Sequence, residues 1–225
     1  MKDNVFQEIL KSITSDLIKK CVNTFNTDYD YEKFKTYEHL QTMLYVHLNQ
    51  INSLRTLEVA INNQELAFSS KICRSTVIDA NQKRSSDCFL WILENLLTLL
   101  PKKQKKEFSK VVRALDSSPI QFKWIKQRLK IKKFLGKSEN AVRIQLITAI
   151  IAYILVFLFK NNCIQCWPMY LLIIWIKSNI DKPLDTALRI LSLKQKPPQI
   201  IKLNETLCQN QHGCPPNAGK TLTGQ

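Results

Sequence analysis

The sequence predicts a mainly α-helical protein, on three observations. Apolar residues recur at steps of three and four along most of the first hundred residues, as in Val5, Phe6, Ile9 and Leu10, and this is the spacing of one helix face. Only four glycines occur in 225 residues, too few for the tight turns of an all-β protein. Apolar residues at 45% and charged residues at 23% are typical of a globular chain and exclude disorder throughout.

The first hundred residues predict a series of helices that ends at Pro101, because proline disrupts a helix interior. Polar clusters separate the helices, and Asn52-Ser53 is a suitable N-cap for one of them. The predicted helices are residues 4–24, residues 37–50, one that follows Ser53, a short one that follows Arg74-Ser75-Thr76, and residues 89–100.

The chain beyond Pro101 predicts a mixture of elements. A lysine-rich helix at 102–110 precedes the β-branched run Val111–Leu115, which reads as a short strand with Asp116 at its tip. A basic helix is expected from Phe122, and Ser138 is expected to cap a further helix that contains an apolar run. Periodicity fades after residue 193, where proline and glycine become frequent, so residues 194–225 are expected to be disordered.

Positive charge is concentrated in the second half of the chain. The formal net charge is +15, from 33 basic and 18 acidic residues. Residues 1–100 hold 11 basic and 12 acidic side chains, whereas residues 101–143 alone hold 14 basic and three acidic ones. Such a segment attracts phosphate backbones or anionic lipid head groups. A solvated lysine-rich face without any partner is the alternative interpretation.

The cysteines favour a reducing cytoplasm over a disulfide framework, because the seven are odd in number and scattered. Acids in the first eight residues also argue against a secretory signal. Cys163 and Cys166 have zinc or redox spacing, and Cys208, His212 and Cys214 could complete a site. No second close pair follows, so buried or incidental thiols are the favoured interpretation.

Two apolar stretches, 146–159 and 169–176, leave a membrane hairpin as an alternative. Each is shorter than the roughly 20 residues needed to span a bilayer. The polar link Lys160-Asn161-Asn162 would suit the turn of such a hairpin. A buried core helix is the favoured interpretation, and a membrane partner is not expected.

Several segments, taken in order, resemble the DDE transposases of bacterial insertion sequences in the large IS-four group. Phe34–Leu40 and Ser53–Glu58 look like that group's N-terminal domain of unknown function. Arg74–Arg84 is similar to its S-T-x-x-x-A-N-x-x-R signature. Phe122–Gln127, continuing to Gly136–Ala141, looks like the helix that closes the catalytic domain.

The resemblance implies a division of the chain and a chemistry. Residues 1–110 would be the helical N-terminal, DNA-binding domain, residues 111–193 a fragment of a ribonuclease-H-like α/β catalytic domain, and 194–225 a tail. In the family, three carboxylates hold two divalent ions, usually magnesium, for in-line phosphoryl transfer on DNA. Asp116 matches the first of these carboxylates and is thereby the candidate catalytic and magnesium-binding residue.

The sequence departs from the family where the rest of the catalytic site should be. Only Ser117–Gln121 separate Asp116 from the closing helix, and a single parallel crossover already needs about a dozen residues. The position that matches the family's glutamate is Pro119. The chain therefore looks like an internally deleted copy without the second aspartate and the glutamate, and we expect no functional magnesium site.

Two basic sets are the candidate DNA-binding residues. One surrounds a short helix-turn-helix-like element and the other forms a lysine face beside an aromatic ring. The residues are Lys71, Arg74, Lys83 and Arg84 in the first set, and Lys123, Lys126, Arg128, Lys130 and Lys133 in the second. A solvated helix pair and a lysine face that only keeps the helix soluble are the alternatives.

These observations together predict a catalytically inactive, DNA-binding remnant of a transposase. Its partners would be insertion-sequence ends and also its own copies or a full-length transposase, and its location would be the bacterial cytoplasm and nucleoid. Two alternatives stay open. The chain could be a small basic membrane-associated protein with an apolar hairpin at 146–176, or a decayed reading frame without a function.

Overall fold

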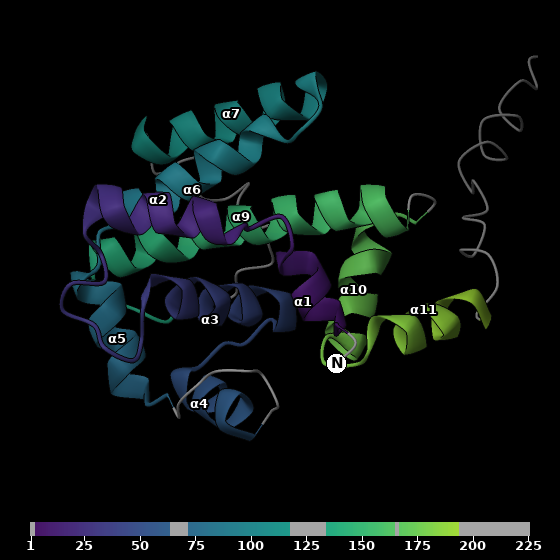
Figure 1. The fold of residues 1–225 in the computed structure, drawn as a ribbon, viewed down its shortest axis with the longest axis horizontal. Coiled ribbons are helices and arrows are strands. Elements are labelled where there is room, and N and C mark those ends of the chain that lie inside the picture. The colour runs from purple at the N-terminus through teal and green to yellow at the C-terminus, as the bar shows by residue number, and fades with distance from the viewer. Residues whose placement is uncertain (1–2, 64–71, 118–133, 165–166, 194–225) are drawn as a thin grey trace, which may run out of the picture.

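The computed structural model describes residues 3–63, 72–117, 134–164 and 167–193, and within these ranges every regular element is a helix (Figure 1). The long helix α9 runs through the middle of the molecule, with α3 on one side and α2 and α6 on the other. The helices are α1 (Val5–Leu10), α2 (Ser15–Phe25), α3 (Thr36–Asn49), α4 (Leu54–Asn63), α5 (Arg74–Lys83), α6 (Ser86–Thr98), α7 (Lys102–Ser117), α9 (Glu139–Cys163), α10 (Met169–Asn179) and α11 (Leu184–Leu193).

The predicted helix 4–24 is divided into α1 and α2, which corrects the sequence interpretation. The backbone of Thr14 is extended, and its hydroxyl accepts a hydrogen bond from the amide of Leu17 at the start of α2. An N-cap of this kind satisfies one of the free amides of a new helix. Continuous apolar periodicity concealed the break, because Ile9 and Leu10 before it, Ile13 within it and Cys21 after it are all buried.

The other helices of the first half lie where the sequence predicts them. Ser53 accepts a hydrogen bond from the amide of Thr56 at the start of α4, as an N-cap does. Helix α5 begins at Arg74, and α6 ends just before Pro101. Helix α6 contributes fully buried side chains such as Phe89 and Leu93 to the core. The helical first half of the fold prediction is therefore confirmed.

The strand predicted at Val111–Leu115 is wrong, because these residues continue α7. Phe108, Val111 and Val112 are spaced at three and four residues and are all buried, which is the pattern of a helix face. Burial of that face outweighs the modest strand preference of valine. Asp116 consequently lies in the last turn of a helix and not at the tip of a strand.

Helix α9 supplies the centre of a single hydrophobic core. Ser138 caps it by accepting a hydrogen bond from the amide of Ala141, as the sequence predicts. It packs against α6, α3, α5 and α1. It is long and apolar enough to cross a membrane, but 72% of its most apolar window is buried inside the protein. The polar link predicted at Lys160-Asn161-Asn162 belongs to α9 itself, so the chain turns later than a hairpin there would require.

The N-terminal segment is tied to the last helices of the chain. Asn4 forms an isolated antiparallel bridge with Pro183, between α10 and α11. The amides of Val5 and Phe6 donate to the carbonyls of Lys182 and Ile180. The hydrophobic core extends without interruption from α1 to α11, and the predicted domain boundary after residue 110 falls inside α7.

Cys21 of α2 and Cys88 of α6 are joined by a disulfide, with their Cα atoms 6.0 Å apart. Both side chains are fully buried. This pair departs from the sequence interpretation, which expected unpaired thiols, because two cysteines at a sequence separation of 67 give no pairing signal in the sequence. The disulfide attaches α2 to the first turn of α6.

Candidate nucleic-acid interface

The basic residues predicted around α5 do not form one cationic surface. Arg74 is paired with Glu58 of α4 at 2.9 Å, and Lys83 is paired with Asp79 one turn earlier at 2.7 Å. Both side chains are exposed, so each could still reach a phosphate, but a neighbouring carboxylate offsets each charge. Lys71, another candidate of this set, lies outside the described residues.

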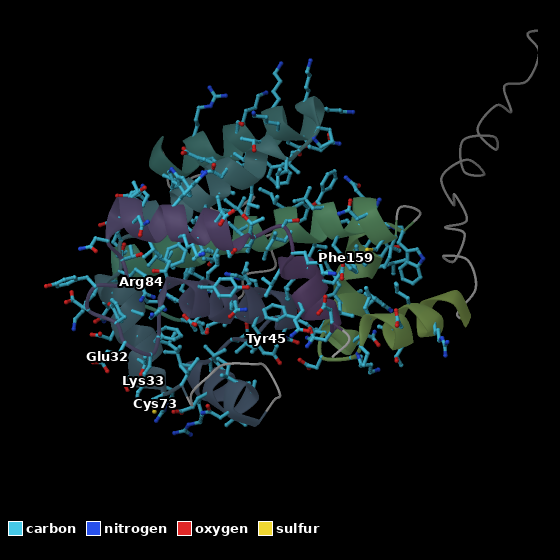
Figure 2. The ribbon with its side chains drawn as sticks, viewed as in Figure 1. Glu32, Lys33, Tyr45, Cys73, Arg84 and Phe159 are labelled. Carbon is cyan, nitrogen blue, oxygen red and sulfur yellow. A yellow bond between two sulfur atoms is a disulfide. The ribbon has the colours of Figure 1, made fainter. Side chains whose placement is uncertain are left out.

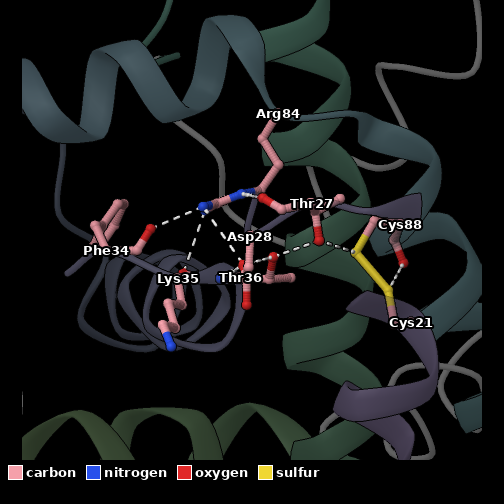
Figure 3. A network of polar contacts seen from close by, with 8 residues as sticks. All are labelled: Cys21, Thr27, Asp28, Phe34, Lys35, Thr36, Arg84 and Cys88. Carbon is pink, nitrogen blue, oxygen red and sulfur yellow. Dashed lines mark hydrogen bonds and ion pairs between the residues drawn. A yellow bond between two sulfur atoms is a disulfide. The ribbon is translucent and has the colours of Figure 1, made fainter. Parts of the chain in front are cut away.

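Arg84, predicted to bind DNA, is instead buried, with 2% of its surface exposed. Its guanidinium donates to the carbonyl oxygens of Phe34 at 2.8 Å, Lys35 at 3.3 Å and Thr27 at 3.4 Å (Figure 3). All three carbonyls belong to the loop between α2 and α3. The prediction for Arg84 is therefore corrected: the side chain attaches this loop to the end of α5 and cannot reach a phosphate.

Asp28 and Tyr31 complete the environment of Arg84. The Asp28 carboxylate lies 3.9 Å from the guanidinium and accepts two hydrogen bonds of 2.6 Å from the amide and hydroxyl of Thr36. The Tyr31 ring lies 4.1 Å from the guanidinium carbon, within cation–π range. Burial lowers the pKa of Arg84, and the charge of Asp28 opposes this shift. We call the contacts of Arg84 with this loop the Arg84 lock.

Two neighbouring asparagines extend the polar network at the end of α5. Asn81, 3% exposed, accepts a hydrogen bond of 2.9 Å from Nε2 of the buried His39. Asn140 of α9 donates its side-chain amide to the carbonyls of Asn81, Gln82 and Arg84. These carbonyls end a helix and have no intrahelical partner, so Asn140 satisfies them from outside. The A-N-x-x-R part of the signature therefore has a structural role in this fold.

Among the residues that the structure describes, exposed cations cluster on helix α7. Figure 2 shows long side chains tipped with nitrogen pointing away from the molecule along α7. Five of them share one side of the helix, within an arc of about 100° at 100° per residue. We call this set the α7 basic face: Lys102, Lys103, Lys106, Lys110 and Arg113, all exposed.

The opposite side of α7 fixes the orientation of this face. Phe108, Val111 and Val112 are 8–9% exposed and lie on the side that faces α6 and α9. The Phe108 ring packs against Tyr153 of α9 with 5.6 Å between the centroids. Three buried side chains at helical spacing prevent α7 from rotating about its axis. The basic face is thereby held toward solvent.

The second predicted basic set, Lys123, Lys126, Arg128, Lys130 and Lys133, lies outside the described residues. The backbone of Asp116 is described and its side chain is not. Within the described residues, no three histidine, cysteine, aspartate or glutamate side chains lie close enough together to hold a metal ion. Asp116 is one of the three carboxylates that the resemblance implies, and we derive no step through a magnesium ion.

Two shallow hollows flank α5. One of about 380 Å³ lies between α4 and α5 and is lined by Arg55, Glu58, Cys73 and Arg74. The other, of about 240 Å³, lies between α5 and the start of α9 beside Asn81.

The predicted cysteine pair is described only at Cys163, the last residue of α9. Burial raises the pKa of this free thiol. Cys166, its predicted partner, lies outside the described residues.

Comparison with known proteins supports a relation to transposases. Residues 2–67 match a family described as "Domain of unknown function (DUF4372)". The chain is also similar to "Putative transposase y4zB" of Sinorhizobium fredii, with 65% identity over 34 residues. That stretch covers 15% of this chain and 10% of the relative. No solved structure matches. The described residues are mainly helical, and the similarity to a transposase is confined to this short stretch.

Sequence reasoning did not identify the cations of α7 as one helix face. The signature around Arg84 has the composition of a DNA-binding motif, but its arginine is used inside the protein. The sequence predicts a lysine-rich helix at 102–110 and a strand at 111–115, and this division separates residues that share one helix. Reading the whole of 102–117 as a single helix would have shown five cations on one side and Phe108, Val111 and Val112 on the other.

Proposed function

We propose that this protein is a DNA-binding relative of the IS-four group of DDE transposases. We further propose that its chain has lost the middle of the catalytic domain and therefore does not catalyse strand transfer. The observation that carries the proposal is the combination of a short similarity to a putative transposase, a match to a domain of unknown function at residues 2–67, and 14 basic residues in 101–143.

DNA binding is supported by the accessibility of positive charge. Six basic residues of α7, including Lys105 beside the α7 basic face, are exposed. Arg74 and Lys83 add exposed but paired cations on α5. A double helix carries about one negative charge per 1.7 Å of its axis, so a surface of this kind gains affinity by releasing counterions. Insertion-sequence ends are the DNA that the family resemblance suggests.

The lack of strand transfer is supported by the sequence around Asp116. Five residues cannot hold the strands that carry the family's second aspartate, and Pro119 stands in place of the glutamate. The acids that follow Asp116 are Glu139, Asp181, Asp185 and Glu205, none in a matching context. One carboxylate is insufficient for a two-metal site. Acids from a partner chain, such as a full-length transposase, would be needed to restore one.

The proposal is tested by binding and cleavage assays on the full chain. We expect retention of labelled duplex DNA on a filter at 50 mM salt, with log affinity falling linearly with log salt. We expect no nicking or strand transfer on an inverted-repeat substrate with added magnesium. Binding that is absent, or that does not depend on salt, overturns the DNA-binding proposal. Magnesium-dependent nicking that Asp116→Asn abolishes overturns the claim of inactivity.

A further inference from the structure

We propose that the α7 basic face is the surface that contacts the phosphate backbone of duplex DNA. This inference rests on the proposed function and assigns it to a place on the molecule. The face consists of Lys102, Lys103, Lys106, Lys110 and Arg113, and it lies outside the motifs that resemble a transposase.

The geometry of α7 suits a row of phosphates. The helix rises about 1.5 Å per residue, so the five cations extend over roughly 16 Å along one side. No described acid forms an ion pair with Lys102, Lys103, Lys106 or Lys110, in contrast to Arg74 and Lys83 on α5. The buried stripe of Phe108, Val111 and Val112 holds the row in one direction.

The charges of α7 are placed where they disfavour the helix itself. Its first turn contains Lys102 and Lys103 and no acid, although the helix dipole makes the amino end favour negative side chains. Lys102, Lys106 and Lys110 follow one another at four-residue steps, where like charges repel. The exposed Glu107 lies one turn from Lys103 and Lys110 and offsets this repulsion in part. Binding of an anionic partner would offset both the unfavourable charges at the amino end and the repulsion between the lysines.

A phosphate backbone suits this face better than a membrane surface does. A helix that lies in a bilayer interface inserts an apolar side between the lipids. The apolar side of α7 is already buried against α6 and α9, where Phe108 meets Tyr153. The exposed side offers long flexible cations without an aromatic ring among the five. Such a surface binds phosphates and reads no bases, so affinity would be independent of DNA sequence.

The test compares two triple variants of the full chain that carry the same change in net charge. Lys103, Lys106 and Lys110 are changed to Gln in the first. The matched control changes Lys20, Lys33 and Lys177, three exposed lysines on α2, on the loop before α3 and on α10. Binding of a labelled 20-base-pair duplex is followed by fluorescence anisotropy between 50 and 200 mM salt. Binding to vesicles of phosphatidylglycerol and phosphatidylcholine is followed in parallel.

The α7 triple is expected to bind the duplex roughly tenfold or more weakly at 0.1 M salt, with a salt slope smaller by up to about 2.7, at about 0.9 per phosphate contact. The control triple is expected to keep most of the slope, and two unrelated duplexes should give equal affinities. If the unchanged protein binds and both triples lose affinity equally, the assignment to α7 is overturned while the proposed function survives. Loss of vesicle binding without loss of duplex binding also overturns it. No binding by the unchanged protein overturns the proposed function itself.

Discussion

Arg84 and the α7 basic face use the same kind of side chain in opposite ways. Arg84 has three carbonyl acceptors, an aromatic ring at 4.1 Å and almost no contact with solvent. The cations of α7 are exposed and crowded together. A guanidinium surrounded by acceptors from its own chain holds a loop in place. A row of cations exposed to water remains available to an anionic partner from outside.

The contrast also separates two sources of free energy. The Arg84 lock is buried, so its hydrogen bonds act in a low dielectric and salt screens them little. The α7 basic face lies in water, where single charges contribute little to stability and a row of them contributes mainly to encounters with anions. Acid, substitution and salt should therefore affect the two regions differently.

Acidification should produce the largest effect, and only on the buried region. Burial lowers the pKa of His39 and of His47 to about 3, whereas an unfolded histidine titrates near 6.5. The unfolded chain binds more protons between these values, so this stability is complete above pH 6.5 and is lost as the pH falls toward 3. The free energy of unfolding should fall by up to about 1.4 kcal/mol per pH unit for each histidine.

Urea unfolding at pH 7, 6, 5 and 4 measures this loss. His39→Gln should reduce the dependence on pH by one histidine's share, and His47→Gln, at the contact between α3 and α9, should do the same. Equal slopes in the wild-type protein and in His39→Gln would exclude His39 as a buried neutral group. Lysines stay charged over this range, so the α7 basic face should not contribute.

Replacement of Arg84 should have the next largest effect. Arg84→Ala leaves three carbonyls and Asp28 without their cation, and we expect a loss of about 3 kcal/mol or more in the free energy of unfolding. Arg74→Ala is the matched control, because its pair with Glu58 is exposed, and it should cost about 1 kcal/mol or less. Urea midpoints that coincide for the two variants would contradict the lock.

If Arg84→Ala does not fold, Arg84→Lys still allows the stability of the Arg84 lock to be measured. Lysine carries the charge but lacks the planar fork that reaches Phe34, Lys35 and Thr27 together. An intermediate loss of stability is expected. Duplex binding by this folded variant should match that of the wild-type protein, because Arg84 is buried.

Asn140→Ala should produce a smaller loss, of about 1–2 kcal/mol, because three carbonyls at the end of α5 lose a shared donor. Asn95→Ala is the control: the Asn95 side chain donates only to the carbonyl of Trp91 in its own helix, at 2.8 Å. Thermal unfolding compares the two. A larger loss from Asn95→Ala would argue that the attachment of α5 to α9 has little energetic weight.

The sequence predicted the secondary-structure elements better than the way they pack against one another. Periodicity and caps were sufficient for α3 to α6 and for the start of α9 at Ser138, because both signals are local. They were insufficient at Thr14, where the apolar pattern continues across a break. They also failed at Val111–Leu115, where burial beside Phe108 decides between helix and strand.

The candidate site was harder to predict, because exposure is a tertiary property. Arg84 and Lys83 are adjacent in the sequence, yet one is buried and the other is 70% exposed in its side chain. The acceptors of Arg84 lie about 50 residues away in the loop before α3. Composition could show that residues 101–143 are basic, but only the packing of α7 shows which side of the helix its cations face.

The smallest expected effect concerns the stability of α7. Changing Lys103, Lys106 and Lys110 to Gln removes like-charge repulsion and an unfavourable charge near the amino end of the helix, and it removes a smaller attraction to Glu107. At 10 mM salt we expect the free energy of unfolding to rise by roughly 0.5 kcal/mol. At 1 M salt, where charges are screened beyond about 3 Å, the rise should disappear.

Salt then distinguishes the two regions within a single experiment. The loss caused by Arg84→Lys should be nearly the same at 10 mM and 1 M salt, because its acceptors are buried with it. If the α7 triple instead lowers stability at both salt concentrations, the lysines contribute to packing through their aliphatic stems. A gain in stability accompanied by a loss of duplex binding would show that these charges oppose folding and favour an anionic partner.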